Sequence, residues 1–227
     1  MRLLFLGLLA ATFLVASPAA AQHDPSHQPG SAAPVVHMPM PGRVALLIEQ
    51  MQAGGLVLVI RHERTEVPAR EDDYTRPAHD CTAQRNLSLA GLAGAGETGV
   101  ALRALDIPID AVISSPMCRT TETARMMFGN YSIEPRLIHP NPGVPGGRGV
   151  DGAGEELLQI LGEIVIGQGN TVLVSHGGNI FRATGLRLAE GEIGILRVSP
   201  DGEVEVLGQV LGSDLGPHAR VALVRSE

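Results

Sequence analysis

Lysine is absent from this 227-residue sequence, in which all 17 basic residues are arginine. That absence excludes three kinds of site that depend on a lysine amine: the phosphate-binding P-loop, the Schiff-base enzyme and the Ser-x-x-Lys nucleophile. The formal net charge is -7. A general nucleic-acid-binding protein would present a basic surface instead, so we expect no nucleic-acid partner.

Long apolar runs are also scarce, and the one at the N-terminus is short. Arg2 precedes an apolar stretch over residues 3–16, and Pro18 and three alanines follow it. This order is typical of a secretory signal peptide over residues 1–21, with cleavage after Ala21. The stretch is too short to span a membrane comfortably, and no cysteine follows it for lipid attachment. We therefore expect an exported protein, periplasmic or secreted, without stable membrane insertion.

Only two cysteines occur, Cys81 and Cys118. In an exported chain an even pair is able to form a disulfide, although sequence spacing alone does not bring two Cα atoms within bridging distance.

Residues 22–42 are rich in proline, histidine and serine and have no helical or strand period, which predicts a disordered linker. Residues 43–227 then form one domain in which helical and strand patterns alternate. Helices are predicted over 43–53, 88–105, 116–129, 155–166 and 180–188, strands over 56–60, 109–115, 133–138 and 171–174, and a hairpin turns at 200–202. This alternation predicts a three-layer α/β/α sandwich with a mainly parallel central sheet.

Polar side chains stand where three of the predicted strands end. Arg61 and His62 follow the first strand, His176 follows the fourth, and the second leads through two serines to Arg119. In an open α/β sheet the carboxyl ends of the strands border the ligand-binding crevice, so these side chains should converge.

Two arginines and two histidines in one crevice suit phosphoryl chemistry. Guanidinium groups bind phosphoryl oxygens in a bidentate manner and disfavour protonation of a nearby imidazole. A neutral histidine is then able to attack phosphorus, while the second imidazole binds the equatorial oxygens. The same positive charge disfavours a metal ion, so we expect neither a metal nor another cofactor.

Four motifs in this order resemble the histidine phosphatase superfamily, also called phosphoglycerate-mutase-like, over roughly residues 56–210. They are "RH" at 61–62, "LS" followed by a glycine at 87–91, "SSPMCRTTETA" at 114–124 and "VLVSHGG" at 172–178. The resemblance implies a phosphoglycerate-mutase-like fold. It also implies that His62 accepts the phosphoryl group and that Arg61, Arg119 and His176 complete the phosphate pocket.

The segment "DCTAQRNLS" at 80–88 resembles an exported bacterial branch of that superfamily, in which it borders the pocket. This implies that Arg85 and Asn86 are secondary substrate contacts. If the loop folds over the pocket, Cys81 approaches Cys118, and we hypothesise a disulfide that braces the loop against the phosphate-binding helix.

The sequence also departs from the family pattern. Glu63 replaces the glycine that usually follows Arg-His, and Gly177 stands where acid phosphatases have an aspartate. The glutamate that serves mutases as proton donor has no counterpart after the third strand. Three candidates for the general acid remain open: Glu63, Asp80 and Glu122.

These observations predict a metal-independent phosphatase that hydrolyses a small phosphomonoester, or a related phosphoryl compound, through a phosphohistidine on His62. The missing proton donor motivates one alternative, a catalytically weak phosphate-binding module, and a phosphomutase is another. A substrate with a good leaving group, such as an anhydride, would need no strong acid. His79, His139 and His218 lack comparable context and are expected at the surface.

Overall fold

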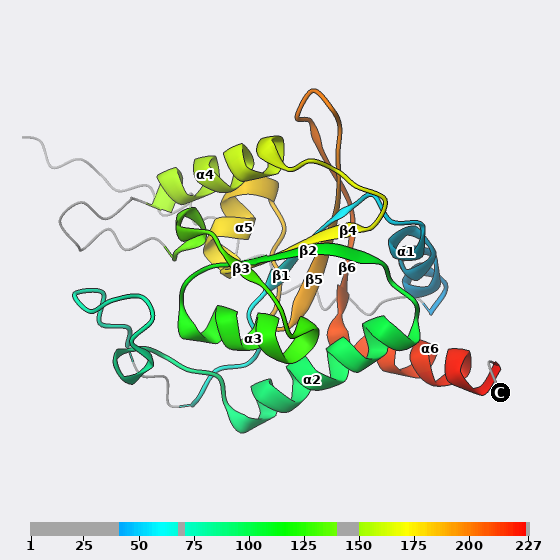
Figure 1. Cartoon of the computed structure of the whole chain (residues 1–227), viewed down its shortest axis with the longest axis horizontal. Helices are drawn as coiled ribbons and strands as arrows, with labels where there is room; N and C mark the ends of the chain where they lie inside the picture. Colours follow the sequence, from blue (N-terminus) through cyan, green and yellow to red (C-terminus); the bar gives the residue numbers. More distant parts are fainter. Residues whose placement is uncertain (1–40, 68–70, 140–149, 226–227) are drawn as a thin grey trace, which may run out of the picture. The chain divides into compact units, whose positions relative to one another are not determined.

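The computed structural model describes residues 41–67, 71–139 and 150–225 (Figure 1). The predicted signal peptide and almost all of the predicted linker lie outside these residues. Within the described part, no helix combines the length and the apolar character needed to cross a membrane.

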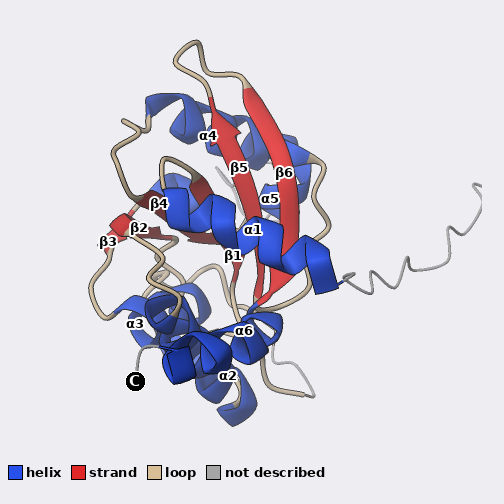
Figure 2. Ribbon diagram, turned by 90° about the vertical axis from the view of Figure 1, so that its right-hand side faces the viewer, coloured by secondary structure: helices blue, strands red, loops and turns tan. Residues whose placement is uncertain are grey.

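A six-stranded sheet forms the centre of the described chain, in the order β3-β2-β4-β1-β5-β6. The strands are β1 (Val57–Arg61), β2 (Ile109–Ser114), β3 (Ser132–Ile133), β4 (Asn170–Ser175), β5 (Glu192–Val198) and β6 (Val204–Leu211). The four strands from β3 to β1 pair in parallel, whereas β5 pairs antiparallel with both β1 and β6. Figure 2 shows the β5–β6 hairpin side by side. The predicted, mainly parallel α/β architecture is therefore confirmed.

Helices cover both faces of this sheet (Figure 1). They are α1 (Pro41–Ala53), α2 (Leu89–Ala104), α3 (Cys118–Phe128), α4 (Val150–Glu163), α5 (Gly177–Thr184) and α6 (Gly212–Arg225), with short 3-10 helices η1 (Cys81–Ala83) and η2 (Pro135–Leu137). Successive residues of β1 point to opposite faces, as in any strand. Leu58 and Ile60 join a core with α1, α2, α3 and α6, whereas Val57 and Val59 join a second core with α4 and α5.

Several predicted boundaries were wrong for identifiable local reasons. The strand predicted over 133–138 stops at Ile133, because Pro135 has no N–H for a strand ladder and opens η2 instead. The helix predicted over 180–188 begins earlier, at Gly177, and ends where Gly185 adopts a left-handed conformation with φ of 76°.

Two further helices begin away from their predicted starts. α3 begins at Cys118 with Met117 as its N-cap, so Pro116 precedes the helix rather than occupying its first turn. α4 runs over Val150–Glu163, about one turn ahead of the predicted helix. The C-terminal helix α6 was not predicted, and Pro217 lies inside it.

The glycines of α2 allow close packing of its backbone. A Cβ atom at Gly99 would collide with the backbone of Met127 in α3, and one at Gly91 would collide with the carbonyl oxygen of Arg64 just after β1. The predicted cap at Ser88 is present, since its Oγ accepts the Gly91 N–H at 3.0 Å. α2 is thereby held against both α3 and the segment that follows β1.

We expect Gly99→Ala to lower the free energy of unfolding by about 1–3 kcal/mol, because the added methyl group overpacks the α2–α3 contact. Gly96→Ala, in the same helix, is the matched control. Its Cβ would meet only Met126 Cε at 3.8 Å, so it should be neutral or stabilising by up to about 1 kcal/mol. Urea unfolding measures both variants, and equal effects would contradict this account of the glycines.

Candidate active site

The two motif histidines lie next to each other because β1 and β4 are parallel neighbours. Arg61 pairs with Ser175 in the ladder, and the His62 N–H donates to the Ser175 carbonyl at 3.1 Å. His62 and His176 therefore leave adjacent strands at the same level, with ring centroids 5.6 Å apart.

His62 is a buried, neutral imidazole with a defined tautomer. Its Nδ1 lies 2.9 Å from the Glu63 carbonyl oxygen, which can only accept, so Nδ1 carries the hydrogen and Nε2 keeps a free lone pair. Burial and the charges of Arg119, Arg61 and Arg85 lower the pKa of His62 to about 3, against the opposing effect of the Glu63 hydrogen bond. The side chain has the state that a nucleophile requires.

His176 presents its Nδ1 without a partner. Its Nε2 lies 2.9 Å from Ser115 Oγ. The Met117 N–H also points to that oxygen, at 3.5 Å, which favours a serine hydroxyl that donates to Nε2 and leaves the hydrogen of His176 on Nδ1. Burial, followed by the charge of Arg119, holds the pKa of His176 well below its ordinary value. His176 is thus a neutral hydrogen-bond donor.

Three guanidinium groups surround the histidines, and each retains an unpaired donor. Arg61 Nη1 donates to the Leu188 carbonyl at 2.9 Å, and the Arg119 side chain is only 1% exposed. The Nε atoms of Arg61, Arg85 and Arg119 are buried without a hydrogen-bond partner, as is His176 Nδ1. A buried unpaired donor costs about 1–3 kcal/mol, so such a group of donors suits a bound anion.

The same charges make a metal ion unfavourable here. Among the described residues, no group of three or more histidine, cysteine, aspartate or glutamate side chains has an arrangement that could hold a metal ion. An open cavity of about 590 Å³ is lined in part by two of these arginines, Arg61 and Arg85, together with Thr65 and Glu190.

Asp72, Tyr74 and His139 join the site although no sequence pattern pointed to them. Asp72 Oδ1 accepts from Arg119 Nη1 and from the Arg85 backbone N–H, both at 2.9 Å. The Tyr74 hydroxyl lies 3.2 Å from Asp72 Oδ2 and 3.2 Å from His139 Nδ1.

His139, which was expected at the surface, is only partly exposed and packs edge-on against His176, with ring centroids 5.3 Å apart. Asp72 and Tyr74 belong to the segment that joins β1 to α2, here called the 66–86 loop, whose contacts no sequence periodicity predicts.

Glu190 is a second carboxylate that sequence reasoning missed. Its Oε1 lies 3.5 Å from Arg61 Nη2, 3.2 Å from Thr65 Oγ1 and 4.0 Å from His62 Nδ1. It therefore stands on the Nδ1 side of the His62 ring, opposite the free lone pair.

The three predicted general acids are placed differently from Asp72. The Glu63 carboxylate accepts the Arg64 N–H at 3.1 Å and lines a separate cavity of about 230 Å³ between Gly94 and Gly191. Asp80 pairs with Arg76 at 2.6 Å and caps η1. Glu122 is a partly buried residue of α3. The carboxylates of Glu63 and Asp80 are thus bound to partners outside the histidine pocket.

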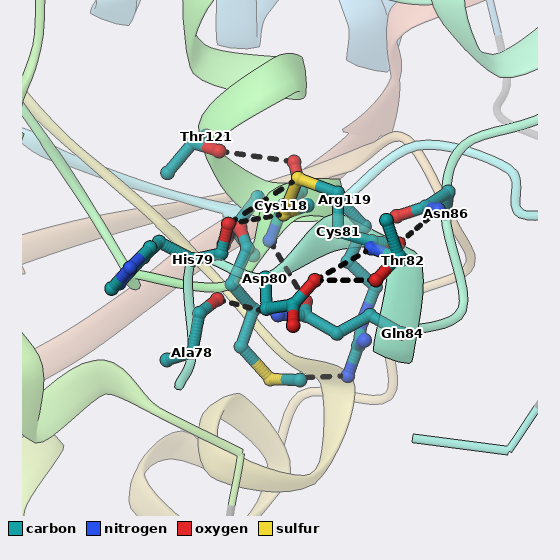
Figure 3. The surroundings of a disulfide bond; sticks show 12 residues. Ala78, His79, Asp80, Cys81, Thr82, Gln84, Asn86, Cys118, Arg119 and Thr121 are labelled. Atoms are coloured by element: carbon teal, nitrogen blue, oxygen red, sulfur yellow. Dashed lines mark hydrogen bonds between the residues drawn. A yellow bond between two sulfur atoms is a disulfide. The ribbon is translucent and has the colours of Figure 1, made fainter. Parts of the chain in front are cut away.

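Cys81 and Cys118 form a disulfide with their Cα atoms 5.6 Å apart (Figure 3). The bond joins the 66–86 loop to the start of α3, next to Arg119. The Cys118 N–H also donates to Gln84 Oε1 at 3.0 Å. Asn86, predicted to contact substrate, donates its Nδ2 to the Cys81 carbonyl at 2.8 Å and so holds the loop itself.

Comparison with known proteins finds solved structures of similar fold. No protein-family model matches the chain, and no curated protein matches it significantly. Phosphoserine phosphatase from Entamoeba histolytica, solved with 3-phosphoglyceric acid, superposes with a TM-score of 0.54 at 16% identity, over 70% of this chain and 98% of that one.

Two further solved structures show the same likeness. Alpha-ribazole phosphatase from Shigella flexneri gives a TM-score of 0.53 at 18% identity, over 70% of this chain and 96% of that one. The product of an open reading frame of Mycobacterium tuberculosis gives 0.51 at 20% identity, over 69% and 96%. The chain therefore has the phosphoglycerate-mutase-like fold that the motifs predicted.

The lowered pKa of His62 predicts its protonation behaviour. The pKa of about 3 in the folded protein lies below the ordinary value of 6.5. Between these two pH values the unfolded chain binds a proton at His62 and the folded chain does not. The stability linked to His62 is therefore fully present above about pH 6.5 and is lost as the pH falls toward about 3.

Nitrogen NMR of the imidazole should show a protonated Nδ1 and no titration between about pH 8 and pH 5. A midpoint near the ordinary value, or a hydrogen on Nε2, would contradict this geometry.

Proposed function

We propose that this protein is a metal-independent phosphatase that forms a phosphohistidine on His62. The observation that carries the proposal is the buried, neutral His62, whose Nδ1 is fixed by the Glu63 carbonyl and whose Nε2 lone pair is free. The unpaired buried donors of Arg61, Arg85, Arg119 and His176 supply the matching oxyanion site.

The chemistry proceeds in two balanced steps. The Nε2 lone pair of His62 forms a bond to phosphorus while the bond from phosphorus to the leaving oxygen breaks, and that oxygen departs with the electron pair and gains a proton. Water then attacks the phosphohistidine, the P–N bond breaks, its electrons return to Nε2, and inorganic phosphate leaves. Arginine and His176 donors stabilise the equatorial oxygens throughout.

A small phosphomonoester is the proposed substrate class. Two proteins of similar fold are a phosphoserine phosphatase and an alpha-ribazole phosphatase, which supports this class without selecting its member. We also propose that the protein works after export, since residues 1–21 have the pattern of a signal peptide and a disulfide such as Cys81–Cys118 persists in oxidising compartments.

The purified protein should hydrolyse p-nitrophenyl phosphate in the presence of a metal chelator. His62→Ala should lower kcat by at least about a thousandfold, because the covalent route is lost. His218→Ala, on α6, is the matched control and should retain activity.

Steady-state kinetics of the unmodified protein, His62→Ala and His218→Ala test the proposed mechanism. Full activity of His62→Ala would contradict the mechanism, and phosphate binding without turnover in the unmodified protein would favour the phosphate-binding module.

A further inference from the structure

We propose that Asp72 is the proton donor to the leaving group, an assignment that rests on the proposed function. Asp72 lies on the 66–86 loop, and its side chain is only 10% exposed. In the described part of the chain, it is the carboxylate bonded to Arg119, the most deeply buried guanidinium of the site.

Three hydrogen bonds fix the Asp72 carboxylate at that position. Arg119 Nη1 and the Arg85 N–H donate to Oδ1, each at 2.9 Å, and the Tyr74 hydroxyl lies 3.2 Å from Oδ2. The loop that carries Asp72 and Tyr74 is itself joined to α3 by the Cys81–Cys118 disulfide. The carboxylate is thus positioned by bonds from several parts of the site rather than left at a mobile surface.

The other carboxylates near His62 are poorly placed for this role. In-line transfer requires the leaving oxygen to depart on the side of phosphorus opposite Nε2. Glu190 stands on the Nδ1 side of the ring, 4.0 Å from that atom. Glu63 lines a separate cavity, and Asp80 pairs with Arg76. Asp72, in contrast, contacts the guanidinium that would hold the phosphoryl oxygens.

Substrate binding would change the charge around Asp72. A phosphoryl group bound to Arg119 brings negative oxygens close to the Asp72 carboxylate, which is bonded to the same guanidinium. A negative neighbour favours the protonated form of a carboxyl group, whereas a guanidinium favours the ionised form. In the proposed mechanism Asp72 receives one proton as the substrate binds, either from a monoanionic phosphoryl group or from water.

Asp72 donates its proton in the first step and accepts one in the second. As the bond from phosphorus to the leaving oxygen breaks, Asp72 transfers its proton to that oxygen, and the product leaves as a neutral alcohol. In the second step the Asp72 carboxylate takes a proton from the attacking water, and one proton then leaves with the phosphate product or to solvent, which returns Asp72 to its starting charge.

Asp72→Asn tests this assignment, because asparagine keeps the shape and an accepting oxygen but cannot donate an acidic proton. The substrates are p-nitrophenyl phosphate, whose leaving group needs no proton, and benzyl phosphate, whose alkoxide does. We expect kcat/KM to fall by about 100-fold or more for benzyl phosphate and by less than about fivefold for p-nitrophenyl phosphate.

Asp73→Asn is the matched control, on the next residue of the same loop. Asp73 is exposed, and its carboxylate accepts the N–H and the hydroxyl of Thr75, at 3.0 and 2.6 Å. Asp73→Asn should leave kcat/KM for both substrates within about twofold of the unmodified protein, as is usual for a surface substitution. The ratio of the two kcat/KM values is the readout, because partial unfolding of a variant lowers both rates equally and leaves the ratio unchanged.

Two outcomes would overturn the assignment. An equal loss on both substrates would show that Asp72 acts only through structure. A gain on both would show that Asp72 merely blocks Arg119. If p-nitrophenyl phosphate hydrolysis depends on His62 in either case, the phosphatase proposal stands and only the proton donor is wrong; if the unmodified protein hydrolyses neither ester, both proposals fail.

Discussion

The parallel pairing of β1 with β4 is the constraint on which the site depends. The ladder runs as far as Arg61 and Ser175, and one further bond, from the His62 N–H to the Ser175 carbonyl, aligns the two chains as they leave the sheet. His62 and His176 are held by backbone geometry at this point. A one-residue change of register between the two strands would turn one histidine side chain to the other face of the sheet.

Burial then sets the chemistry of these two side chains. The imidazoles of His62 and His176 are almost inaccessible to water, and the neighbouring guanidinium groups make a further positive charge unfavourable. Desolvation and charge repulsion act in the same direction, so both rings stay neutral. The arginines are partly compensated by Asp72 and Glu190, which pair with Arg119 and Arg61. The site thus combines guanidinium donors with carboxylates of its own, an arrangement that suits the anion binding that we propose.

Sequence patterns predicted the sheet and the residues at its strand ends well. Buried strands are recognised as continuous apolar runs. Polar residues directly after such a run, such as Arg61-His62, must lie at the carboxyl end of the strand, where the crevice is. Residues on irregular segments gave no such signal. Asp72 and Tyr74 reach the site through a loop without periodicity, and His139 follows η2 where a strand was predicted. Their positions depend on tertiary contacts, including the disulfide at Cys81, that only the folded chain reveals.

The most direct measurement on the central claim is to locate the phosphoryl group during turnover. Rapid quenching into alkali preserves phosphohistidine, and mass spectrometry of the digested protein identifies the modified residue. The neutral ring with its lone pair on Nε2 predicts a phosphoryl group on Nε2 of His62. Turnover with no phosphorylated histidine, or with the group on another residue, would contradict the account.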